Sequence, residues 1–142
     1  MRIEELLEKP YWIMDIFPRQ VQASEGGQYF KIEHYYLRRM PLLCRKYVNW
    51  LLKLNCYFDI DVSHDGENWQ SNPEPEDMEQ WVESCMSEAP SVSSLFVLLK
   101  KGQVLLMVER DSTYMTIYNP TEDMLELMGQ LAASEGLFVW KP

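Results

Sequence analysis

Two apolar runs of five residues each, Leu95–Leu99 and Val104–Val108, flank a turn that contains Lys100, Lys101 and Gly102. Short apolar runs on either side of such a turn predict the two strands of a β-hairpin. Since these strands are apolar on both faces, both faces of the sheet need cover, either from helices of the same chain or from a second copy in a homodimer. Neither run approaches the roughly 20 apolar residues that cross a bilayer, so we expect no membrane segment.

Other segments also have the pattern of strands. Residues 57–63 alternate polar and apolar side chains, which is typical of a strand with one buried face. A turn at residues 64–68 is expected to lead through Trp69 into a returning partner strand, and residues 113–118 follow another turn. The clearest strands are residues 11–17, 57–63, 95–99, 103–108 and 137–140.

Proline, glycine and acidic residues mark the ends of the predicted helices. Pro41 is placed as a first helical residue, prolines and acids fill the first turn after Asn72, and Gly136 fits the position just past a helix end. The segment Tyr29–Met40 fits a helix or a strand. The predicted helices are residues 2–8, 41–55, 72–86 and 119–136.

These elements do not alternate as strand, helix, strand. We therefore expect a single α+β domain over residues 1–142, with a largely antiparallel sheet of about five strands covered by three to four amphipathic helices. The predicted helix 41–55 has an apolar stripe, and its opposite face is basic and includes Trp50. The stripe consists of Cys44, Tyr47, Val48, Leu51, Leu52 and Leu54.

Charge is distributed unevenly along the chain. Between Lys53 and Lys100 there is no Lys or Arg, whereas the preceding residues 28–53 carry six Lys or Arg and the single acid Glu33. With a net charge of −9, this asymmetry governs solubility and the choice of partner rather than the fold. The ten carboxylates between the two lysines are Asp59, Asp61, Asp65, Glu67, Glu74, Glu76, Asp77, Glu79, Glu83 and Glu88.

The basic segment, residues 28–53, interleaves aromatic side chains with cations. Aromatic residues beside positive charge are how single-stranded nucleic acids are held. The neighbouring acidic segment and the net charge of −9 would repel a phosphate backbone, however. Nucleic acid is therefore disfavoured as a partner.

Two loop motifs bear on the acidic segment. Residues 63–69, Ser-His-Asp-Gly-Glu-Asn-Trp, resemble a shortened Asp-box hairpin, a turn motif of sialidase-like propellers, and this resemblance implies a turn and no activity. Residues 61–66 match the first half of a calcium loop, but the twelfth position of that loop would be Asn72 in place of a bidentate Glu. We expect an acidic turn and no metal site.

No catalytic signature is present. His34 and His64 are thirty residues apart, and Cys44 and Cys85 lie on apolar stripes where thiols are usually inert. Cys56 could pair with a histidine only if the fold brings the two together. Phosphate-loop and zinc-protease motifs are missing, so we expect no catalytic residues and no cofactor.

The cysteines and the N-terminus indicate a cytoplasmic location. Three cysteines without a CxxC pair indicate neither a disulfide framework nor a zinc site. The first eight residues, Met-Arg-Ile-Glu-Glu-Leu-Leu-Glu, are too acidic for a signal peptide.

We therefore expect a small acidic, non-catalytic binding protein that docks a cationic protein partner through residues 59–88. Complementary charge would speed association and add specificity, and an aromatic side chain among charges would serve as the anchor. The predicted contact residues are Asp65, Glu67, Trp69, Glu76 and Glu79. The alternative is a small enzyme or ligand-binding domain with a pocket near the aromatic residues 28–40.

Overall fold

The structure is a computed structural model that describes residues 3–22, 24, 26–87, 92–99, 101–110 and 112–142. Its strands are β1 (Tyr11–Asp15), β2 (Ile60–Ser63), β3 (Gln70–Ser71), β4 (Ser94–Leu99), β5 (Val104–Glu109), β6 (Met115–Tyr118) and β7 (Phe138–Trp140). They form one sheet in the order β3-β2-β4-β5-β6-β1-β7, and each neighbouring pair is antiparallel.

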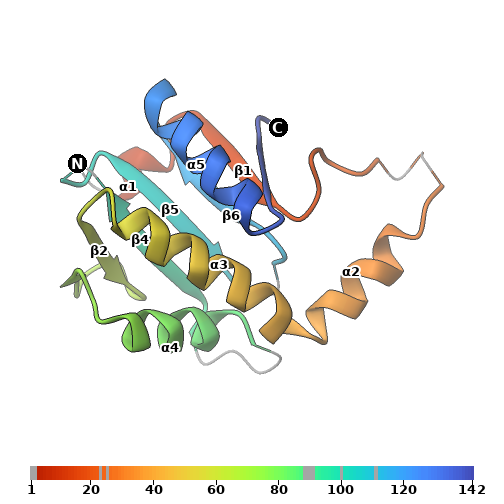
Figure 1. Cartoon of the computed structure of the whole chain (residues 1–142), viewed down its shortest axis with the longest axis horizontal. Coiled ribbons are helices and arrows are strands. Elements are labelled where there is room, and N and C mark those ends of the chain that lie inside the picture. The colour runs from red at the N-terminus through yellow and green to blue at the C-terminus, as the bar shows by residue number, and fades with distance from the viewer. Residues whose placement is uncertain (1–2, 23, 25, 88–91, 100, 111) are drawn as a thin grey trace.

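Helices cover this sheet mainly from one side, with α3, α4 and α5 lying over the same face (Figure 1). The helices are α1 (Ile3–Leu6), α2 (Tyr29–Leu37), α3 (Met40–Asn55), α4 (Pro75–Cys85) and α5 (Glu122–Ser134). None of these helices of the described residues is both long and apolar enough to cross a membrane.

The predicted mixture of helices with an antiparallel sheet is confirmed, but the numbers of elements were too low. The described residues contain seven strands rather than about five, and five helices rather than three to four. The additional elements are short or exposed. β3 has two residues and β6 has four, too few for an alternating pattern to be distinctive.

The ambiguous segment after residue 28 is a helix. α2 ends at Leu37, the chain turns at Arg38 and Arg39, and α3 begins at Met40. No residue of α2 is fully buried, which explains why its apolar periodicity was weak. α2 projects away from the sheet, at the right of Figure 1.

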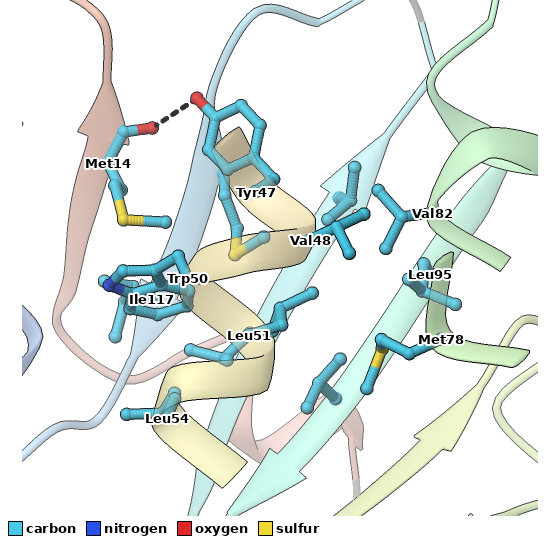
Figure 2. Close-up of a cluster of buried hydrophobic side chains, with 14 of the residues drawn as sticks. Met14, Tyr47, Val48, Trp50, Leu51, Leu54, Met78, Val82, Leu95 and Ile117 are labelled. Carbon is cyan, nitrogen blue, oxygen red and sulfur yellow. Dashed lines mark hydrogen bonds between the residues drawn. The ribbon is translucent and has the colours of Figure 1, made fainter. Parts of the chain in front are cut away.

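The core lies between the sheet and the layer of α3, α4 and α5, here called the first face. Figure 2 shows Leu51 of α3 and Met78 of α4 directed toward Leu95 of β4, while Tyr47 reaches the Met14 carbonyl oxygen. The Tyr47 hydroxyl lies 2.6 Å from the Thr113 carbonyl oxygen and 3.2 Å from that of Met14. This buried tyrosine therefore ties α3 to β1 and to the residue before β6.

Trp50 contradicts its predicted placement on an outer basic face, because it is fully buried. Its indole N–H donates to the Met128 carbonyl oxygen of α5 at 3.1 Å. The flank of α3 that faces α5 is thus covered, which the periodicity of one helix cannot reveal. Two residues of the same flank, Lys46 and Lys53, donate hydrogen bonds to Glu135 at the end of α5.

The second face of the sheet is only partly covered. Leu98 and Leu105 are cross-strand neighbours on this face, and α1 lies against β5. Ile13 and Asp15 of β1 belong to the same face, since they alternate with Met14 of the core. α1 therefore covers the second face near β4 and β5, and the β1 side carries different side chains.

The predicted ends of the last helix are confirmed. The Thr121 hydroxyl accepts a hydrogen bond from the Met124 N–H at 3.3 Å, as expected of an N-cap. Gly136 has a φ of 73° just past the helix end, a conformation that glycine adopts without strain.

Candidate functional site

The turn between β2 and β3 is built around one carboxylate. Asp65 Oδ1 accepts hydrogen bonds from the backbone N–H groups of Glu67 and Asn68, both at 2.8 Å, and from the Ser63 hydroxyl at 2.8 Å. These bonds, led by those from Asn68 and Glu67, hold the pKa of Asp65 below its usual range. The predicted hairpin is confirmed, and the Asp65 charge maintains its turn.

The five predicted contact residues do not form one patch. Asp65, Glu67 and Trp69 line a cavity of about 490 Å³ together with Phe96 and Leu98 of the second face. Glu76 and Glu79 belong to α4, which packs on the first face. The two groups occur at the same end of the sheet, where Figure 1 shows the β2–β3 hairpin beside α4.

Glu79 takes part in a mixed-charge groove between α3 and α4. The Arg45 guanidinium donates to Glu79 Oε1 at 2.8 Å, and both side chains are substantially exposed. The groove has a volume of about 640 Å³, and Arg38 and Glu83 line it as well. With two cations and two carboxylates in its walls, it has no dominant sign of charge.

Most carboxylates of residues 59–88 have no cationic neighbour. Glu88 falls outside the described residues, and among the nine others only Glu79 forms an ion pair within the described part of the chain. Asp61 accepts the Ser71 hydroxyl and Asp59 accepts the Asn72 amide, both of which leave the charge in place.

The nearby basic residues are engaged elsewhere. Lys53 forms an ion pair with Glu135, and Lys46 donates to the Glu135 backbone carbonyl oxygen at 2.8 Å. The Arg39 guanidinium lies 4.0 Å from the centre of the Tyr35 ring. Of the described basic residues, only Arg45 is directed to the acidic segment, so intramolecular pairing leaves that segment negative.

Sequence reasoning missed a buried carboxyl on β1. Asp15 is only 7% exposed and lines a cavity of about 320 Å³. Burial raises the pKa of Asp15 to about 6, with a further increase from Glu33, while the hydrogen bond from the Ile16 N–H opposes the shift. The available signal was an acid in an otherwise apolar strand, on the same side as Tyr11 and Ile13.

The cysteines offer no reactive thiol with a base beside it. Burial raises the pKa of Cys44 to about 12 and that of Cys85 to about 11, which disfavours the nucleophilic thiolate. Cys56 is exposed, and its thiol lies 3.6 Å from the Leu52 carbonyl oxygen. The described ranges contain no group of three or more His, Cys, Asp or Glu side chains that could hold a metal ion.

Comparison of the chain with protein-family models, with curated proteins and with solved structures finds no match.

Proposed function

We propose that the protein is a non-catalytic binding protein that docks a cationic protein partner through its acidic end, defined as residues 59–88. One observation carries this proposal: the described carboxylates of the acidic end, apart from Glu79, lack intramolecular cations. A segment with this much uncompensated charge attracts a surface rich in Lys and Arg and speeds its approach.

The arrangement of the elements supports a partner rather than self-neutralisation. The β2–β3 hairpin and α4 lie at the left of Figure 1, while the basic helix α2 projects at the right. At physiological salt, screening takes about 8 Å, so α2 does little to offset the field of the acidic end. The same field repels nucleic-acid phosphates.

Trp69 remains the best aromatic contact within the acidic end. It is half-buried beside Glu67, and its ring borders the cavity that includes Phe96 and Leu98. A partner side chain with an aliphatic stem and a cationic head, such as Lys or Arg, fits this pairing of apolar wall and carboxylate. The proposed cellular location is the cytoplasm, a setting in which three free cysteines stay reduced.

The test measures binding of a fluorescent oligolysine peptide to the whole chain. In a triple variant, Glu76→Gln, Asp77→Asn and Glu83→Gln remove three carboxylates of α4 and keep their shapes. We expect the Kd to rise about tenfold, since each exposed contact is worth roughly 0.5 kcal/mol. The wild-type affinity should also fall as the salt concentration rises.

The matched control removes three exposed carboxylates from α5, by Glu122→Gln, Asp123→Asn and Glu126→Gln. Both triple variants change the net charge equally, and both alter the first turn of a helix. If the two variants weaken oligolysine binding to the same degree, only the total charge matters and the acidic end is no docking surface.

A ligand-binding role is the second candidate. The observation that favours it is the cavity beside Asp15, to which Tyr29 of the aromatic segment contributes.

A further inference from the structure

The second face of the sheet has an aromatic cavity on its β1 side. Its walls come from four separate parts of the chain: β1 with the residues that follow it, the first turn of α2, the segment before β6, and β7. The side chains that matter for its chemistry are Tyr11, Asp15, Phe17, Tyr29, Tyr114 and Trp140. A volume of about 320 Å³ suits a small organic ligand.

Asp15 is the carboxyl of this cavity, and it is poorly satisfied. Its Oδ1 accepts the Ile16 N–H at 2.7 Å, and no other described residue donates a hydrogen bond to it. Such burial without a cation is costly for a carboxylate. Glu33 of α2 adds repulsion. A ligand that brings a positive charge would remove this cost.

Two cationic side chains lie near the cavity. Arg19 lines it, yet the pKa of Asp15 responds to burial, to the Ile16 N–H and to Glu33. Lys141 lies at the rim, where its ammonium is 5.6 Å from the centre of the Tyr11 ring and 4.3 Å from that of Trp12, and it donates to the Tyr11 carbonyl oxygen. The rings of β1 thus already hold one ammonium group by their faces.

We propose that this cavity binds a small organic ammonium ion with an apolar body, whose charged group pairs with Asp15 while its body packs among the aromatic side chains. Aromatic walls favour a cation through their ring quadrupoles, and a carboxylate adds a charge-assisted hydrogen bond. An anion would be repelled by Asp15 and Glu33, and a neutral ligand would leave the carboxylate unpaired.

The site is separate from the acidic end. Four strand spacings lie between β2 and β1 in the sheet, which is about 19 Å. The cavity also opens on the second face, whereas α4 packs on the first. Failure of oligolysine docking would leave this proposal intact, and the converse also holds.

The probe is benzylammonium, followed by ¹H–¹⁵N NMR of the whole chain, with benzyl alcohol as its neutral counterpart. We expect benzylammonium to shift the backbone amides of Asp15 and Ile16 and the Trp140 indole N–H. Benzyl alcohol should bind at least about tenfold more weakly, because it lacks the charge.

Affinity should also depend on pH. Between about pH 7.5 and about pH 5, protonation of Asp15 should weaken benzylammonium binding about tenfold. Burial and its hydrogen bond to Glu33 raise the pKa of Tyr29 to about 12, and burial also raises the pKa of Tyr47, so neither tyrosine titrates in this interval. A Glu33→Gln variant, studied in parallel, separates the effect of Asp15 from that of its neighbouring carboxyl.

The decisive variant is Asp15→Asn, which keeps the shape and an oxygen for the Ile16 N–H. It should bind benzylammonium no better than benzyl alcohol, whereas Glu83→Gln on the first face should bind like the wild type. If Asp15→Asn does not fold, the selectivity and pH response of the wild type still decide. No amide shifts with benzylammonium at millimolar concentration, equal affinity for the alcohol, or an affinity unchanged at low pH would each overturn the proposal.

Discussion

Three polar residues are buried in the described part of the chain, and they differ in how well their side chains are satisfied: Asp15, Ser63 and Thr113. The Ser63 hydroxyl lies within the hydrogen-bonded turn around Asp65, where it also accepts the Gly66 N–H at 2.9 Å. Asp15 has one hydrogen bond from its neighbour and no cation. A protein that keeps such a residue gives up stability at that position, as binding sites commonly do.

Replacement of Asp15 by Asn should therefore stabilise the protein near neutral pH. The pKa of Asp15 is about 6 in the fold against a usual 3.8, so ionisation of this group opposes folding. Stability linked to Asp15 is fully present below 3.8 and is lost as the pH rises to about 6. At about pH 7.5 the variant should gain about 2 kcal/mol in free energy of unfolding, measured with urea.

The same pair of proteins at about pH 4 is the internal control, because both then carry an uncharged side chain at this position and should differ little. A variant that is no more stable than the wild type at neutral pH would mean that the carboxylate already has a compensating partner.

Among the elements, α2 contributes least to the core. Phe30 is 73% exposed, and Ile32 and Tyr35 are also exposed. The helix is connected to the rest of the protein mainly through α3 and through Tyr29, whose ring lies 5.8 Å from that of Phe17. Its folding should be nearly independent of the core.

An Ile32→Pro substitution tests that independence. Proline removes the hydrogen bond from the Ile32 N–H to the Gln28 carbonyl oxygen and breaks the helix interior. We expect the free energy of global unfolding to fall by less than about 1 kcal/mol, while the α2 amides lose their hydrogen-exchange protection. Leu52→Pro, the equivalent break in α3, should prevent folding. A comparable loss from both substitutions would show that α2 is part of the core.

Elements with a buried face and clear end signals were predictable from the sequence. α3 begins one residue before Pro41 and ends at Asn55, and α5 ends just before Gly136, because proline and glycine restrict the backbone at these points. α2 lacks a buried face, so its pattern was ambiguous. The Asp15 cavity could not be predicted, since its walls come from segments with no fixed spacing along the chain.

For the molecule as a whole, the uneven charge has a thermodynamic consequence. With a net charge of −9 and few cations directed at the acidic end, the exposed carboxylates there repel one another in the folded state. Not all of them are equally unfavourable. Glu76 and Asp77 lie in the first turn of α4, where the helix dipole stabilises negative charge. Glu67 and Glu83 lie outside such a turn and have no ion pair with a described residue.

Salt should therefore stabilise the protein, since it screens this repulsion within about 8 Å at physiological strength. We expect the Tm measured by calorimetry to rise by about 3 °C between low and physiological salt, the equivalent of roughly 1 kcal/mol. A double variant with Glu67→Gln and Glu83→Gln should begin with a higher Tm at low salt and respond less to added salt. Glu126→Gln in α5 is the control, because α5 lies outside the acidic end. A Tm that falls with salt would mean that ion pairs such as Arg45–Glu79 and Lys53–Glu135 outweigh the repulsion, and that the acidic end is less negative than its residues indicate.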